Sequence, residues 1–132
     1  MARILVLDDD PHIRELLETL LELEGYEVIT APDGRLGMEL FRSARPDLVI
    51  TDMIMPDQEG IETIRMIRRL DPDVSILAIS GNTARLAAGR TTLDAARLLG
   101  ADRSLAKPFG AGELRRAVAD LLEPKATEDA SG

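Results

Sequence analysis

A short apolar run that ends on a single carboxylate, from Asp47 to Asp52, constrains the fold of this chain more than any other feature. Its central residues, LVIT, are continuously apolar or β-branched rather than alternating, as expected of a strand covered on both faces. An acid is costly to bury without a partner, so the terminal Asp52 should emerge into a cleft. Pro56 then prevents further regular pairing. We therefore expect a buried strand that delivers Asp52 to a site.

Similar apolar runs alternate with helical patterns along the whole chain. The expected strands are residues 4–7, 26–31, 47–52, 75–80 and 103–106, and the expected helices cover about 11–24, 34–45, 61–70, 93–99 and 114–122. Five successive strand and helix pairs are typical of a parallel sheet with helices on both faces. The sequence therefore predicts an α/β fold with three layers, a doubly wound five-stranded parallel sheet.

Length, charge and composition narrow the class of protein. We expect one domain over residues 1–123 and a disordered polar tail over residues 124–132. The net charge of −8 argues against direct nucleic-acid binding, which requires a basic face. There is no cysteine and hence no thiol chemistry. Apolar runs of about four residues cannot span a bilayer, and no signal peptide precedes the first strand, so we expect a cytoplasmic protein.

The ends of the expected strands carry a chemically coherent set of side chains. Ligands bind beyond the carboxyl ends of the strands in a sheet of this kind. Three acids at one edge would repel each other, so at least one should have a raised pKa, and a bound hard cation such as Mg²⁺ would relieve the conflict. A carboxylate beside a cation and an ammonium is well placed to attack phosphorus. The set consists of Asp8, Asp9, Asp52, Ser80 and Lys107.

In this order and spacing, the residues resemble the receiver domain of two-component response regulators. The resemblance covers about Arg3 to Leu122 and rests on LVLDDD, DLVITDMIMPD, Gly60, the serine that ends ILAIS, and the Lys-Pro-Phe triplet from Lys107 to Phe109. It implies a flavodoxin-like sheet with strand order 2-1-3-4-5. It also implies a phosphoprotein that carries an aspartyl phosphate, with Mg²⁺ as its cofactor.

The resemblance also assigns a role to each residue of the set. Asp52 would accept a phosphoryl group from a histidine kinase or phosphotransfer protein, and the Lys107-Pro108 peptide bond would be cis. Mg²⁺ would be held by Asp9 directly, by Asp8 through water, by Asp52 and by the backbone carbonyl of Ile54. Ser80 would donate a hydrogen bond to the phosphoryl oxygens, and Lys107 would pair with them. The protein would not be an enzyme in the ordinary sense, because it would catalyse only its own phosphotransfer and a slow autodephosphorylation.

Three residues in or near this set have individual interpretations. Two have a structural explanation, and the third supports a role in the site. Asp10 is placed to cap a helix that begins at Pro11. His12, the only histidine, is expected to be an exposed helix residue. Lys107 is one of only two lysines, because 14 of the 16 basic residues are arginine, and a lysine here favours a role specific to an ammonium.

The chain departs from the family pattern in two places. Ser104 stands three residues before Lys107, where the family usually has an aromatic residue that takes part in switching. The connection from Ser80 to Lys107 is also about five residues longer than usual in the family. We hypothesise that residues 81–92, which include Arg85 and Arg90, replace the aromatic side chain as the moving part. The apolar side chain of Ile54 cannot orient water, which predicts slow self-hydrolysis.

The leading prediction is a stand-alone receiver that signals through protein contacts. Its downstream target would bind the face formed by the fourth helix, the fifth strand and the fifth helix. One alternative is a haloacid-dehalogenase-like phosphatase that uses Asp8 and Asp10, although the Gly-Thr and the later acidic pair of that family are missing. Another is an inactive pseudo-receiver that serves as a docking scaffold. The kinase, the output partner, the pathway and the oligomeric state are not predicted.

Overall fold

The structure is a computed structural model that describes residues 1–53, 59–80, 97 and 100–122. Its elements in chain order are β1 (Arg3–Leu7), α1 (Pro11–Leu23), β2 (Glu27–Ala31), α2 (Gly34–Ala44), β3 (Leu48–Asp52), α3 (Glu59–Leu70), β4 (Ser75–Ser80), β5 (Arg103–Ala106) and α5 (Ala111–Leu122). The predicted helix over residues 93–99, the hypothesised switch over 81–92 and the predicted tail fall wholly or almost wholly outside the described residues.

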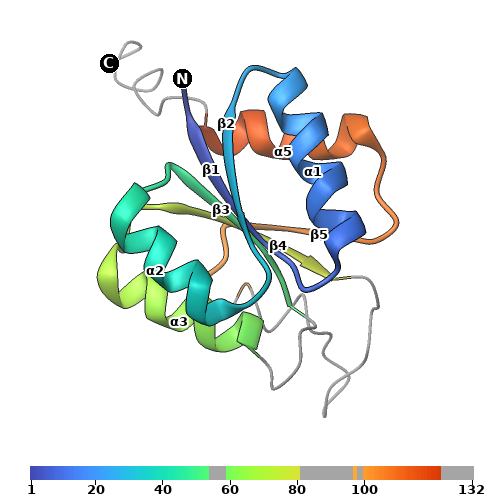
Figure 1. The fold of residues 1–132 in the computed structure, drawn as a ribbon. Coiled ribbons are helices and arrows are strands. Elements are labelled where there is room, and N and C mark those ends of the chain that lie inside the picture. Colours follow the sequence, from blue (N-terminus) through green and yellow to red (C-terminus); the bar gives the residue numbers. More distant parts are fainter. Residues whose placement is uncertain (54–58, 81–96, 98–99, 123–132) are drawn as a thin grey trace.

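The described strands form one parallel sheet in the order β2-β1-β3-β4-β5. Helices α1 and α5 cover one face of this sheet, and α2 and α3 cover the other (Figure 1). The predicted fold class and strand order are therefore confirmed. Because all the strands run in the same direction, their carboxyl ends lie along one edge, and the residues that follow them become neighbours.

Alternation along β1 shows how the two cores form on either side of the sheet. Successive side chains of a strand point to opposite faces. Ile4 and Val6 pack in the core with α1 and α5, whereas Leu5 and Leu7 pack in the core with α2 and α3. All four are buried because both faces of the strand are covered. A continuous apolar run is what this arrangement requires, and it explains why the strand pattern does not alternate.

Local capping sets where the first helices begin and end. The carboxylate of Asp10 accepts a hydrogen bond from the His12 N–H at 2.9 Å, and Pro11 is the first residue of α1, so both predictions are confirmed. Asp33 caps α2 in the same way through the Leu36 N–H at 2.9 Å. Beyond α1, Gly25 has φ of +93°, a conformation that favours glycine.

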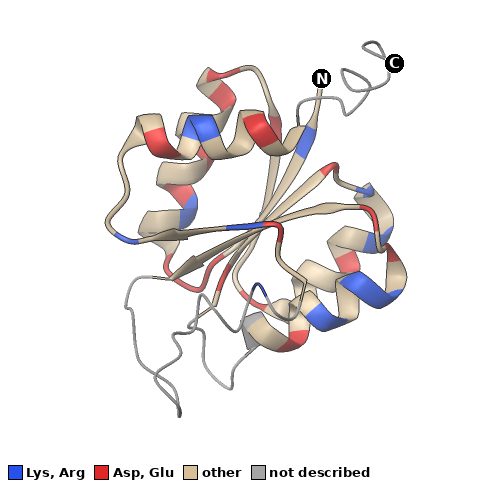
Figure 2. Ribbon diagram, turned by 180° about the vertical axis from the view of Figure 1, so that it is seen from behind, with Lys and Arg blue, Asp and Glu red and all other residues tan. Residues whose placement is uncertain are grey.

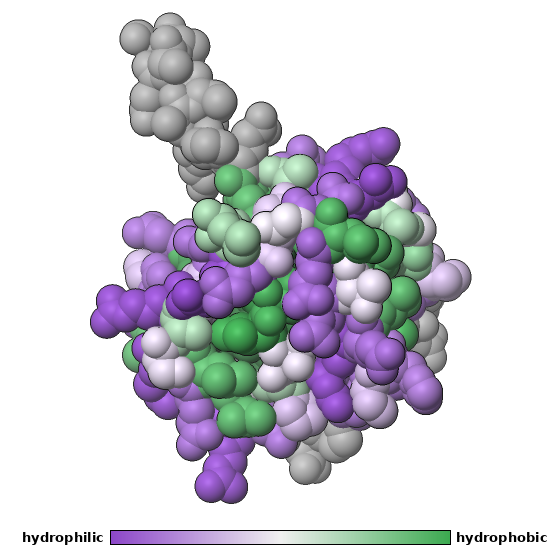
Figure 3. All heavy atoms as spheres, turned by 45° about the horizontal axis from the view of Figure 1, so that its top comes forward, coloured by the Kyte–Doolittle hydropathy of each residue, from purple (hydrophilic) through white to green (hydrophobic). Residues whose placement is uncertain are grey.

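The surface of the described residues is mixed in charge and hydropathy. Basic residues gather on α3, whose last turn carries Arg68 and Arg69 (Figure 2). The face in Figure 3 is mainly hydrophilic, with apolar side chains near its middle. Among the described residues, none of the helices combines the length and hydrophobicity needed to cross a bilayer.

Candidate functional site

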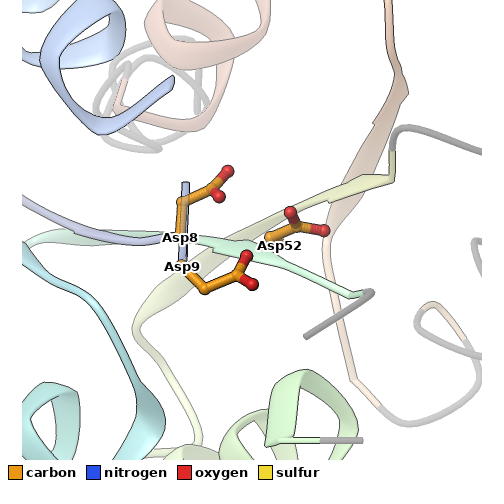
Figure 4. Close-up of side chains that lie close together, drawn as sticks. All are labelled: Asp8, Asp9 and Asp52. Carbon is orange, nitrogen blue, oxygen red and sulfur yellow. The ribbon is translucent and has the colours of Figure 1, made fainter. Parts of the chain in front are cut away.

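The ends of β1 and β3 bring three carboxylates together. Leu7 is in register with Thr51, so the residues that follow each of them, Asp8 and Asp52, emerge side by side. Asp9 comes next on the first of these segments. One carboxylate oxygen from each aspartate can be chosen so that all three lie within 4.8 Å of one another, as the close-up in Figure 4 illustrates. The predicted acidic cluster is therefore present.

The three acids differ sharply in their exposure to solvent. Asp8 and Asp52 are buried, with 1% and 5% of their surface exposed, whereas Asp9 is exposed. Asp52 is the last residue of a strand whose every residue is buried. The cluster thus has two buried members and one member that faces solvent.

Lys107 neutralises part of this negative charge. Its ammonium lies 3.2 Å from Oδ2 of Asp8 and 3.1 Å from Oδ2 of Asp52. The backbone N–H of Lys107 donates to the carbonyl oxygen of Ser80 at 2.7 Å, which ties the residue after β5 to the end of β4. Ser80 is fully buried there. The Lys107-Pro108 bond is cis, as the family resemblance implied.

The charges in this cluster perturb one another. Burial raises the pKa of the Asp8 carboxyl above its ordinary value of 3.8, and the nearby charge of Asp52 adds to that effect, although the Asp10 N–H and the Lys107 ammonium oppose it. Burial alone would lower the pKa of Lys107, but hydrogen bonds and attraction to Asp52 and Asp8 outweigh it and raise that pKa. The prediction of a raised carboxyl pKa is confirmed, with burial rather than repulsion as the largest cause.

The backbone around Asp8 is held by three hydrogen bonds. The Asp8 N–H donates to the carbonyl of Ala31 at 3.2 Å, and the Asp10 N–H donates to Oδ1 of Asp8 at 2.9 Å. Nη1 of Arg14 donates to the carbonyl oxygen of Asp8 at 2.6 Å. The sequence analysis did not single out Arg14. An arginine four residues after a run of three acids, about one helical turn beyond Asp10, was the available signal.

The remaining predicted residues fall outside this cluster or outside the described residues. Ile54, expected to contribute its carbonyl, lies outside the described residues. His12 is exposed on the first turn of α1, as predicted. Ser104 is half-buried in β5, where it pairs with Ala78 of β4.

The chemistry of the cluster fits a hard divalent cation. Oxygen atoms of a few carboxylates, with water completing the shell, are the environment that Mg²⁺ prefers. Asp8, Asp9 and Asp52 supply such oxygens, and one of these residues faces solvent. Within the described residues, the three carboxylates lie beside the ammonium of Lys107, and a bound cation would further reduce the repulsion among them.

Comparison with known proteins identifies the family. The family model described as the response regulator receiver domain matches residues 4–119. The chain belongs to this family. The receiver domain is a module of two-component signalling, and the match does not favour the dehalogenase-like alternative.

Individual relatives agree with the family match. The receiver domain is 39% identical over 133 residues to response regulator MprA of Mycolicibacterium vanbaalenii, a match that covers 99% of this chain and 54% of that protein. A solved receiver domain from Clostridium thermocellum is 31% identical with a TM-score of 0.84, covering 96% of this chain and 98% of that one. TrrA from Thermotoga maritima, solved in complex with Mg(2+)-BeF, is 38% identical with a TM-score of 0.80, covering 92% of this chain and 100% of that one.

The curated relatives are longer than this chain. The receiver domain spans about half the length of the curated relatives it matches, with 54% of MprA and 45% of a probable transcriptional regulator, ycf27, from Galdieria sulphuraria covered. The family assignment therefore concerns the receiver module, and the prediction of a stand-alone regulator stays a prediction.

Proposed function

We propose that this receiver domain accepts a phosphoryl group on Asp52 from a histidine kinase or phosphotransfer protein, with Mg²⁺ as cofactor. The observation that carries the proposal is the double contact of Lys107, whose ammonium lies within 3.2 Å of both Asp8 and Asp52 beside the exposed Asp9. A buried carboxylate, a paired ammonium and further acids for a cation are the parts that phosphoryl transfer needs.

The reaction moves one phosphoryl group between two side chains. An oxygen of the Asp52 carboxylate forms a bond to phosphorus while the bond from phosphorus to the donor's imidazole nitrogen breaks. The electron pair of the broken bond stays on that nitrogen, and the ring leaves as a neutral imidazole because its other nitrogen carries a proton. The product is an acyl phosphate on Asp52. Its formation adds negative charge to a cluster that already contains three acids, so charge stabilisation is the main requirement.

Each residue of the site has its own role in the proposed phosphoryl transfer. Lys107, whose ammonium donates a hydrogen bond to the Asp52 carboxylate, transfers that contact to the phosphoryl oxygens in this proposal. Asp9 would hold the cation directly and Asp8 through water, together with Asp52 and the backbone carbonyl of Ile54. When bound, Mg²⁺ neutralises the charge that develops on the phosphoryl oxygens. Ser80, at the end of β4, donates its hydroxyl hydrogen bond to the phosphoryl group.

The complex of TrrA with Mg(2+)-BeF supports the cation assignment, because that protein is 38% identical and shares the fold. Further parts of the proposal concern rates and partners. The apolar side chain of Ile54 makes autodephosphorylation slow. The phosphorylated domain signals through a protein that binds the face including β5 and α5, and any output beyond this module depends on the full-length protein.

The test is incubation with acetyl phosphate and Mg²⁺ followed by intact-mass measurement. The wild-type protein should gain one phosphoryl group, and Asp52→Asn should gain none. Asp73→Asn, an exposed acid before β4, is the matched control and should behave as wild type. An adduct that persists in Asp52→Asn, or that is absent from the wild type, would contradict the assignment.

A further inference from the structure

The three aspartates of the site are not held equally. The carboxylate of Asp8 accepts hydrogen bonds from the Asp10 N–H and from Lys107, and the carboxylate of Asp52 also accepts from Lys107. In the described part of the chain, no hydrogen bond or ion pair to the Asp9 carboxylate is seen, and this side chain is exposed. The position of Asp9 therefore depends on its backbone.

Arg14 holds one peptide unit of that backbone. The carbonyl that accepts from Nη1 of Arg14 at 2.6 Å belongs to the peptide unit that joins Asp8 to Asp9. A peptide unit is planar, so a fixed carbonyl also fixes the direction of the Asp9 N–H and limits where its Cα can lie. A hydrogen bond from a charged donor such as this guanidinium is stronger than one between neutral groups.

Arg14 is itself firmly placed. It lies in the first turn of α1, where its own N–H donates to the Asp10 carbonyl at 3.0 Å. Its side chain is half-buried, so the guanidinium is partly shielded from water. Arg14 thus links helix α1 to the peptide carbonyl next to Asp9, the exposed acid of the site.

We infer that Arg14 is a positioning residue for Asp9, which sets the geometry of the cation site. The inference rests on the proposed function, because it takes Asp9 to be a ligand of Mg²⁺. Without the Arg14 guanidinium, the Asp8–Asp9 peptide can rotate, and Asp9 must be ordered again each time the cation binds. Loss of such a supporting contact weakens metal binding by about 10- to 100-fold.

The experiment measures Mg²⁺ affinity directly by isothermal titration calorimetry. Tryptophan fluorescence is not an option, because the chain contains no tryptophan. Arg14→Met should weaken Mg²⁺ binding about tenfold or more. Arg14→Lys keeps the charge and one donor and should recover part of the affinity. Phosphorylation of Arg14→Met by acetyl phosphate should be slow at low Mg²⁺ and approach the wild-type rate at saturating Mg²⁺.

Arg68→Met is the control for a purely structural effect. Arg68 also donates to backbone carbonyls, but at the opposite edge of the sheet, so its loss should lower stability and leave Mg²⁺ affinity unchanged. If Arg14→Met does not fold, Arg14→Lys alone tests the inference. It should then bind Mg²⁺ more weakly than the wild type and have the same thermal stability.

Two failures can be told apart. If the wild type binds no Mg²⁺, the proposed function itself is overturned. If the wild type binds Mg²⁺ and the folded Arg14 variants bind it equally well, only the role of Arg14 is overturned.

Discussion

The two edges of the sheet differ in how a basic side chain is surrounded. At the carboxyl edge, the single ammonium of Lys107 lies among the three carboxylates of the site. At the amino edge, the guanidinium of Arg68 is surrounded by acceptors. It donates to the carbonyls of Gly100 at 2.9 Å, Pro72 at 3.2 Å and Val74 at 2.5 Å, and pairs with the Asp102 carboxylate at 2.7 Å.

The difference separates an edge built for stability from one built for chemistry. Around Arg68, donors and acceptors are matched, and Asp102 also accepts from the Ile76 N–H at 2.8 Å. Such matched networks hold segments together, here the end of α3 and the starts of β4 and β5. Around Lys107, three carboxylates of the described residues lie near its ammonium, and the pKa of Asp8 is raised as a result of burial and a like charge. Clustered acids with a perturbed pKa are typical of functional sites.

The largest effect, on the rate of phosphorylation, is expected from removing the Lys107 ammonium at the carboxyl edge. Lys107→Met should slow phosphorylation of Asp52 by about 100-fold, because a preorganised charge that stabilises the transferring group is lost. The measurement is the time course of adduct formation by intact mass at saturating Mg²⁺. Arg103→Met, which removes an exposed ion pair between β5 and α5, should leave that rate within about twofold of wild type because exposed pairs contribute little. Equal phosphorylation rates for Lys107→Met and wild type would contradict a role of the carboxyl edge in phosphoryl transfer.

A large effect on folding is expected at the amino edge. Arg68→Met should lower the free energy of unfolding by about 3 kcal/mol, because several half-buried acceptors lose a charged donor at once. Arg69→Met, at the exposed neighbouring position of α3, should change it by less than about 0.5 kcal/mol. Urea unfolding monitored by circular dichroism measures both. Similar unfolding free energies for the two variants would show that the Arg68 network does not stabilise the fold.

The smallest expected effect is a gain in stability at the carboxyl edge. The pKa of Asp8 is higher in the folded protein than its ordinary value of 3.8, so the folded state favours the protonated carboxyl. As pH rises from below 3.8, the charged form increasingly disfavours folding. Without metal, Asp8→Asn should therefore gain in unfolding free energy relative to wild type as pH rises through this range, and keep the advantage at neutral pH.

The matched comparison for this prediction is Asp73→Asn, at an exposed acid for which no such gain is expected. Thermal unfolding in the presence of a chelator, at several pH values, measures the difference between each variant and wild type. A wild type that is as stable as Asp8→Asn at every pH would argue that the acids at this edge are fully compensated.

The sequence was a good guide wherever the chain direction alone brings residues together. Asp8, Asp9, Asp52 and Lys107 each follow or end a strand, and parallel strands bring those positions to one edge, so their proximity was predictable from the sequence alone. The caps at Asp10 and Pro11 were predictable for a similar reason, since they depend on neighbours only a few residues away.

Tertiary structure decided the contacts that depend on how side chains reach across elements. The acceptors of Arg68 come from the turn before β4 and from the residues before β5, 34 positions away in the case of Asp102, and no local pattern marks them. Arg14 reaches back from α1 to one particular carbonyl, which depends on the angle between helix and strand. A raised pKa was expected from repulsion for at least one of the three acids. It is found at Asp8, where its largest cause is burial, and burial is set by the packing of the whole chain rather than by the order of its residues.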